Sequence, residues 1–279
     1  MSNTRQMVVA VIALALLVWT GALYAEQAAV PVESNADAEA GNGSATGGGI
    51  APAGAEPAAN SVTGWVVDAG GWLGMGLDGA KNQQDAVASA NMGSPLVILT
   101  DRGAVVYPVS LAVPSSPNGN NARLMPFAGQ RVTVTGQVIR RGNENGVVIE
   151  TVTKAPGPEK TASFPSRESA NVRLVARVSD LSCWVGKGES GAAHVQCAQA
   201  CAGAGEPLVL VGDNAYIYYP VTQTVPAGPA DIATLMQYCE KNVQVTGKLI
   251  ERGRERAVLI DNVAEYAPGA KPASSSSRK

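Results

Sequence analysis

Three of the four cysteines and the only histidine lie in one short stretch of the sequence, at Cys183, His194, Cys197 and Cys201. The alanine and glutamine residues of segment 192–204 favour a helix. In a helix His194, Cys197 and Cys201 follow the spacing i, i+3 and i+7, so they share one face. Cys183 is expected in the loop after a strand, where it can complete a set of three sulfurs and one nitrogen. Such a set suits Zn²⁺ or Cu(I), because thiolate and imidazole are soft or borderline ligands.

The same cysteines can instead form structural disulfides or a reactive thiol-redox arrangement. If the chain is exported, its four cysteines allow two bridges. On one helix, Cys197 and Cys201 would have β-carbons about 6 Å apart, whereas a disulfide needs roughly 3.8 Å. Cys183 would therefore pair with one of them, and Cys239, on a later helix, with the other. The metal, disulfide and redox alternatives all stay open at this point.

Two residues beside this cluster are expected to support it. Asp180 ends the strand before Cys183, and an aspartate at such a place usually closes the following loop. Trp184, next to Cys183, is expected to pack as a core lid over the barrel mouth. An earlier copy of the stretch keeps both residues, as Asp68 and Trp72, which favours a structural role for them.

The chain contains an internal duplication. An offset of 112 residues aligns Pro-Leu-Val at 95–97 with Pro-Leu-Val at 207–209. After a Pro-rich loop absorbs one residue, an offset of 111 aligns Val-Thr-Gly at 134–136 with Val-Thr-Gly at 245–247. The sequence therefore predicts two domains, repeat 1 at 61–153 and repeat 2 at 171–266, joined by a Pro- and Ser-rich linker at 154–170.

Repeat 1 lacks the soft ligands of repeat 2. The positions of Cys183, His194, Cys197 and Cys201 hold Gly71, Asn82, Asp85 and Ser89. All four positions differ together, as expected of residues that act as one unit. Repeat 1 is therefore predicted to be a structural or docking module, and repeat 2 to carry the Cys/His centre.

Hydrophobic period and turn residues predict one order of elements in both repeats: three strands, a short helix, then a two-stranded hairpin. In repeat 2 the strands are expected at 172–180, 208–211, 216–221, 243–251 and 257–263, and the helix at 231–240. This order resembles the OB-fold, a small five-stranded barrel. The pattern Asp-x-x-Cys-Trp followed by His-x-x-Cys-Ala-x-x-Cys is similar to that of uncharacterised exported bacterial proteins. The expected fold is mainly β: two tandem five-stranded OB-like barrels, each with short helices, after an N-terminal apolar helix.

Residues 7–25 form an apolar run without a charged residue. Such a run can span a bilayer as a helix, or act as a signal peptide that is cleaved after Ala25. The Ala-, Gly-, Pro- and Ser-rich segment 26–60 is expected to be a disordered linker, and 267–279 a disordered tail. The sequence thus predicts a bacterial envelope protein on the periplasmic or extracytoplasmic side. Residues 7–25 would anchor it in the inner membrane, or it would be secreted after cleavage.

Composition and motifs argue against several classes of function. A net charge of −2 and only 5% aromatic residues disfavour a nucleic acid partner. A Ser–His–Asp triad would need the one histidine, which lies in the cysteine cluster, and the chain has no P-loop or dinucleotide-binding motif. We expect a non-enzymatic binding or assembly module with a protein partner in a membrane or envelope complex. The alternative is a thiol-redox or soft-metal (zinc or copper) handling protein.

Overall fold

The computed structural model describes residues 60–158, 161–213, 215–228, 230 and 232–266. The predicted apolar helix and anchor at 7–25, the linker up to residue 59 and the tail at 267–279 lie outside the described residues. Among the residues described, no helix is long and apolar enough to cross a membrane. The described residues all belong to one compact unit.

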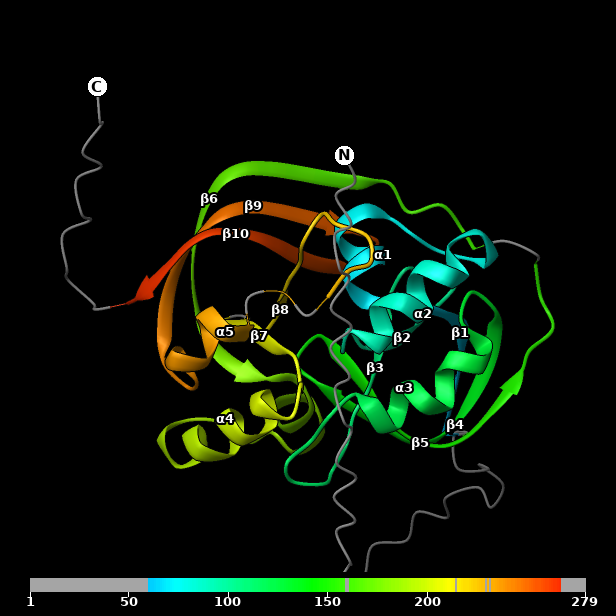
Figure 1. The fold of residues 1–279 in the computed structure, drawn as a ribbon, viewed down its shortest axis with the longest axis horizontal. Coiled ribbons are helices and arrows are strands. Elements are labelled where there is room, and N and C mark those ends of the chain that lie inside the picture. Colours follow the sequence, from blue (N-terminus) through cyan, green and yellow to red (C-terminus); the bar gives the residue numbers. More distant parts are fainter. Residues whose placement is uncertain (1–59, 159–160, 214, 229, 231, 267–279) are drawn as a thin grey trace, which may run out of the picture. The chain divides into compact units, whose positions relative to one another are not determined.

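The strands of repeat 1 close into a five-stranded barrel (Figure 1). They are β1 (Ser61–Asp68), β2 (Leu96–Leu99), β3 (Val105–Pro108), β4 (Arg131–Arg141) and β5 (Glu144–Lys154). Their order around the barrel is β1-β2-β3-β5-β4, with β3 and β5 parallel and the other neighbours antiparallel. The connections hold short helices: α1 (Ala69–Met75), η1 (Ala80–Asn82), α2 (Gln83–Asn91), α3 (Asn118–Leu124) and η2 (Met125–Phe127).

The strands of repeat 2 close into a second barrel with the same order, β6-β7-β8-β10-β9, and again a parallel pair, β8 and β10. They are β6 (Ser166–Asp180), β7 (Leu208–Gly212), β8 (Ile217–Pro220), β9 (Asn242–Arg252) and β10 (Glu255–Glu265). The helical segments are η3 (Cys183–Lys187), η4 (Ala192–His194), α4 (Val195–Gly203), α5 (Ile232–Leu235) and η5 (Met236–Tyr238). The prediction of a mainly β chain with two five-stranded sheets and few short helices is confirmed.

Some element boundaries differ from those expected. β6 begins at Ser166, inside the segment expected to be linker, because its first residues pair with the end of β9. The helix expected at 231–240 is shorter: α5 ends at Leu235 and the turn η5 replaces its second half. The helix expected from residue 192 starts with the 3-10 turn η4, so α4 begins only after His194.

Two glycines at matching positions, Gly136 in β4 and Gly247 in β9, allow neighbouring strands to come close. A β-carbon on either would collide with a backbone oxygen of the facing strand, that of Val148 or Leu259. The strand register shifts beside Gly136 and just after the residue opposite Gly247. Such irregularities bend long strands, which helps a small sheet to close.

Each barrel has its own apolar core, and a third core contains residues of both repeats. Trp72 and Trp184 are only 1% and 5% exposed and both lie in this shared core, rather than over the mouth of one barrel as expected. Tyr107 and Tyr219 belong to it too, and their rings stack with centroids 6.4 Å apart. The repeats are therefore packed against one another through large buried side chains.

Each repeat also supplies a buried glutamate to the backbone of the other. Glu144 Oε1 accepts a hydrogen bond from the N–H of Ile217 at 3.0 Å. Glu255 Oε1 accepts one from the N–H of Val105 at 2.8 Å. These are corresponding residues of the two repeats, so the contact is reciprocal, as in the two-fold interface of a dimer.

Candidate metal centre

Repeat 2 places Cys183 at the start of a single π-helical turn, three residues after the last residue of β6. Asp180, the last residue of β6, accepts a hydrogen bond at Oδ1 from the Cys183 N–H at 2.8 Å. The turn η3 ends at Gly188, whose φ of 74° lies in the left-handed region. Gly188 and Glu189 both donate their backbone N–H to the Cys183 carbonyl, at 2.9 and 3.3 Å. The chain thus folds back so that Glu189 lies beside Cys183.

The imidazole of His194 is buried, and carboxylates face both of its ring nitrogens. Nδ1 lies 2.9 Å from Glu240 Oε1. Nε2 lies 3.4 Å from Asp180 Oδ2 and 3.6 Å from Glu189 Oε2. These two contacts lack hydrogen-bond geometry, and within the described chain Nε2 and Asp180 Oδ2 are buried without a hydrogen-bond partner. Among the described residues, therefore, no hydrogen bond occupies this ring nitrogen, which faces two carboxylates.

Glu240, which holds His194, was missed by the sequence analysis. Its buried side chain also accepts hydrogen bonds from Ser179 Oγ and from the Gly191 N–H, both at 2.7 Å. At the offset of 111 its counterpart in repeat 1 is Gly129. The replacement of a glycine by a buried carboxylate beside the cluster is the signal that could have identified it.

Four candidate ligand atoms come together at the surface end of the cluster. Those of Cys183, Glu189, His194 and Cys197 all lie within 4.8 Å of one another. The two sulfurs are 3.9 Å apart. Glu189, whose side chain is 47% exposed, was not predicted, because a carboxylate in a loop has no distinctive spacing.

Cys201, predicted on the same helix face, falls into a second group with Asp180 and Cys183, whose ligand atoms also lie within 4.8 Å of one another. Its sulfur accepts a hydrogen bond from the backbone N–H of Ser115 in repeat 1, at 3.3 Å. The corresponding contact on the other side is the Ala227 N–H to Ser89 Oγ, at 2.8 Å. Cys201 is thus turned toward repeat 1.

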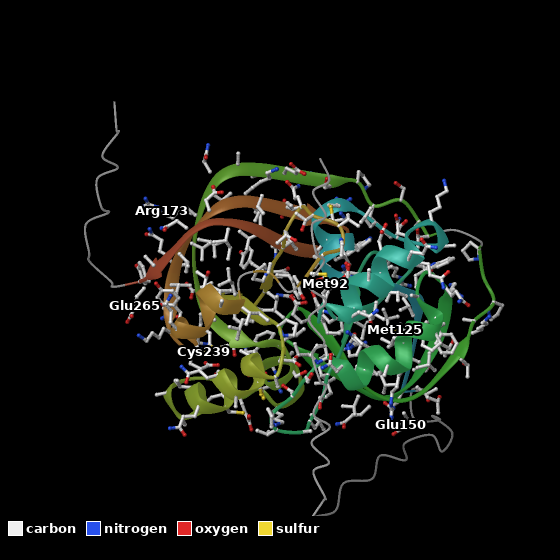
Figure 2. The ribbon with its side chains drawn as sticks, viewed as in Figure 1. Met92, Met125, Glu150, Arg173, Cys239 and Glu265 are labelled. Carbon is white, nitrogen blue, oxygen red and sulfur yellow. The ribbon has the colours of Figure 1, made fainter. Side chains whose placement is uncertain are left out.

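Cys239 lies in the apolar core of repeat 2, after the turn η5 (Figure 2). Burial raises the pKa of its thiol to about 12. Neither ligand group contains it. All four cysteines are free thiols in this structure, so the bridge proposed between Cys239 and the cluster is not formed here.

The cluster concentrates acidic groups in a place with little water. Burial, and after it the charge of Asp180, raises the pKa of the Cys183 thiol well above its ordinary value. Burial likewise raises the pKa of Cys197 and of Asp180, the latter against the hydrogen bond from the Cys183 N–H. A bound cation reverses this effect, because a coordinating thiol is deprotonated outright.

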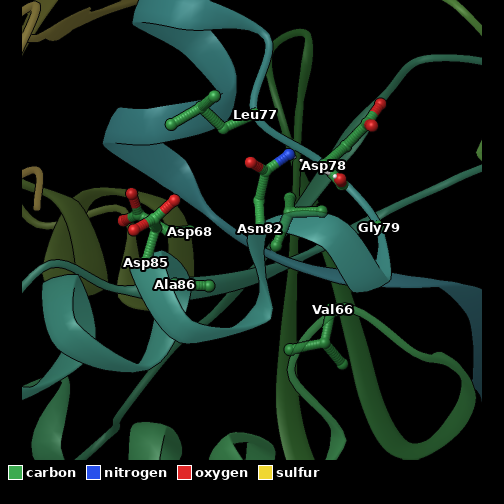
Figure 3. Close-up of a pocket in the computed structure, with 10 residues that line it drawn as sticks. Val66, Asp68, Leu77, Asp78, Gly79, Asn82, Asp85 and Ala86 are labelled. Atoms are coloured by element: carbon green, nitrogen blue, oxygen red, sulfur yellow. Dashed lines mark hydrogen bonds between the residues drawn. The ribbon is translucent and has the colours of Figure 1, made fainter. Parts of the chain in front are cut away.

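Repeat 1 has a small cavity at the corresponding place (Figure 3). Its volume is about 10 Å³, the room needed for roughly one water molecule. Asp68, Asn82 and Asp85 line it, in the positions of Asp180, His194 and Cys197. The Asn82 side-chain amide donates to the Asp78 carbonyl at 2.8 Å. The two repeats therefore share the framework of this site but not its ligands.

Comparisons with protein-family models, with curated proteins and with solved structures give no match for this chain.

Proposed function

We propose that repeat 2 binds a zinc ion through Cys183, His194 and Cys197, with Glu189 as the fourth ligand. The state of His194 carries the proposal: Glu240 holds Nδ1, while Nε2 is buried and has no hydrogen-bond partner in the described chain. Histidines that bind metals usually donate their other ring N–H to a carboxylate or carbonyl, which fixes the ring and the tautomer. A disulfide would explain the cysteines but gives this histidine no role.

The spacing of the sulfurs agrees with the same ion. Two thiolates that each lie about 2.3 Å from a tetrahedral zinc ion are separated by about 3.8 Å. Cys183 and Cys197 have their sulfurs 3.9 Å apart, whereas a disulfide requires about 2.05 Å. Zinc is favoured over Cu(I) because carboxylate oxygen, here from Glu189, is a poor ligand for a soft monovalent ion.

Glu189 is the ligand most open to solvent, Cys197 is half-buried, and Cys183 and His194 are buried. The Glu189 side chain is 47% exposed, whereas His194 is 5% exposed. Closed tetrahedral sites are typical of structural zinc, and a replaceable fourth ligand leaves a coordination position open. We therefore infer that an external ligand can replace Glu189 on the ion. Such exchange fits a soft-metal binding or handling protein.

The strand order, the parallel pair in each barrel and the helical segments between the third and fourth strands support two tandem OB-like barrels. Residues 7–25 would anchor the chain on the extracytoplasmic side of a bacterial inner membrane. Repeat 1, which lacks the thiols, would serve as the structural or docking half toward a partner protein in the envelope.

The test measures the zinc content and the cysteine oxidation state of the full chain and of its variants, each purified from the exported fraction without added reductant. His194→Ala is expected to lower bound zinc and the unfolding temperature together, because binding energy at such a site contributes to folding. Cys239→Ser is the matched control and should keep its zinc. Oxidised cysteines with no bound metal, together with a silent His194→Ala, would falsify the zinc proposal and leave the disulfide alternative.

A further inference from the structure

The two loop-closing aspartates, Asp68 and Asp180, differ in one respect. In repeat 1 both oxygens of Asp68 are bonded: Oδ2 accepts from the Gly71 N–H at 2.7 Å, and Oδ1 accepts from Ser94 Oγ. In repeat 2, Oδ1 of Asp180 takes the corresponding loop N–H, that of Cys183. Oδ2 of Asp180 is buried and without a hydrogen-bond partner among the described residues. Its neighbours are the His194 Nε2, at 3.4 Å, and the Cys183 thiol. A buried carboxylate oxygen in this position is stabilised by a bound cation.

Within the described chain, Asp180 Oδ2 lacks a hydrogen bond because repeat 2 has different residues around it from those that surround Asp68 in repeat 1. The place of Ser94 is taken by Glu206, which accepts a hydrogen bond from the Ser182 N–H at 3.0 Å instead of donating to the aspartate. The places of Gly71 and Ser89 are taken by Cys183 and Cys201. Repeat 2 has thus removed the donor to one carboxylate oxygen and placed two sulfurs near it. The three ligand atoms lie within 4.8 Å of one another.

We propose that Asp180, Cys183 and Cys201 hold a second zinc ion, and that the Cys183 thiolate bridges the two ions. This inference rests on the zinc site proposed above, because Cys183 belongs to both ligand groups. An exogenous ligand such as water is the fourth ligand of the second ion. With each ion about 2.3 Å from the shared sulfur, the two ions lie at most about 4.6 Å apart. The Ser115 N–H to Cys201 Sγ bond places a donor from repeat 1 on a terminal thiolate of this pair.

The experiment counts zinc ions per chain. The full chain is reduced, saturated with zinc, freed of excess ion and analysed for zinc and protein. Two ions per chain are expected. A value of one overturns the second site and leaves the first standing, and a value of zero overturns the proposed function itself.

Variants assign the second ion. Cys201→Ser should reduce the count from two to one, and it should fold, because serine at the matching position of repeat 1 accepts the same backbone hydrogen bond. Asp180→Asn retains an oxygen for the Cys183 N–H and should also lose one ion. Cys239→Ser should keep both. Two ions retained in Cys201→Ser would overturn the assignment.

Cobalt in place of zinc gives a second readout. Two Co²⁺ ions that share a thiolate are magnetically coupled, and this coupling must disappear in Cys201→Ser.

Discussion

The carboxylate of Glu255 in repeat 2 accepts a hydrogen bond from the backbone N–H of Val105 in repeat 1, at 2.8 Å. Glu255 is 8% exposed. Burial, followed by the nearby charge of Glu144, raises its pKa from 4.5 to about 8, against the hydrogen bond from Val105 and the charges of Arg254 and Arg256. The contact therefore joins the repeats through a buried acidic group that holds its proton more tightly than an exposed glutamate does.

This relationship predicts how stability depends on pH. Glu255 holds its proton more tightly in the folded than in the unfolded chain, so its contribution is full below about pH 4.5 and is lost as the pH rises to about 8. Glu255→Gln keeps an acceptor oxygen but cannot ionise. Relative to the variant, the wild-type free energy of unfolding should fall by a few kcal/mol, roughly 1.4 kcal/mol per pKa unit, between pH 4.5 and 8.

Urea unfolding at several pH values measures this difference. Glu265→Gln is the control, because the Glu265 side chain is 59% exposed and its ion-pair partner is Lys241, so the pH profile should stay unchanged. Parallel profiles for wild type and Glu255→Gln would contradict the prediction.

Glu240 should tune the metal site without being a ligand. Glu240→Gln replaces the charged acceptor of the His194 ring by a neutral amide, and loss of such a partner usually weakens metal binding by about 10- to 100-fold. Competition with a chromophoric chelator measures the change. Glu265→Gln, which removes an exposed partner of Lys241, should bind zinc like the wild type. An unchanged affinity in Glu240→Gln would show that Glu240 does not hold the ligand.

Removal of the metal should destabilise the chain. At free zinc about 1,000-fold above the dissociation constant, binding adds about 4 kcal/mol to the folded state, so a chelator should lower the unfolding temperature. Cys183→Ala should start at the lower temperature and no longer respond to the chelator. Cys239→Ala should be less stable than wild type, from the loss of a buried side chain, yet keep the response. A wild-type chain that ignores the chelator would argue for a metal-free cluster.

Gly136 should be intolerant of any side chain. Its φ of 150° and the closeness of the Val148 carbonyl leave no room for a β-carbon, so Gly136→Ala should destabilise by at least about 1–3 kcal/mol. Gly119 in α3 has no atom within 4 Å of such a β-carbon. Gly119→Ala should therefore be neutral or gain up to about 1 kcal/mol. Thermal unfolding of the two variants compares them directly, and equal effects would refute the argument from close approach.

The membrane anchor is tested by fractionation and by sequencing the N-terminus of the mature chain. Residues 7–25 have the length and apolar character of a membrane span, so the protein should remain with the membrane after a high-salt wash and retain its first residue. A mature chain that begins at Glu26 would replace the anchor with a cleaved signal peptide.

The sequence predicted the two sheets well because repetition and periodicity are local signals. Val134 and Val245 stand in equivalent alternating strands, and both are buried in their barrels. Cys183, His194 and Cys197 could be grouped because helical spacing and a strand end bring them together. Cys201 could not be placed in the same way: its orientation depends on the Ser115 N–H, a contact made by the other repeat.

The carboxylates escaped prediction for a similar reason. Glu189 reaches the cluster only because the turn after Cys183 reverses the chain. Glu240 comes from a loop 46 residues away from His194. Glu144 and Glu255 each follow a hairpin turn, where a charged side chain is usually exposed, and only the packing of one barrel on the other shows that both are buried.

The exchange of glutamates between the barrels also determines what happens when the chain is cut. A protease that cleaves the connection between β5 and β6 would break the covalent link but none of the reciprocal contacts of Glu144 and Glu255 or the shared core. The two fragments should then elute together in gel filtration and separate only in denaturant. The two repeats, produced as separate polypeptides, should therefore reassemble. Repeat 2, which carries all four cysteines, could then be labelled alone or replaced by a variant.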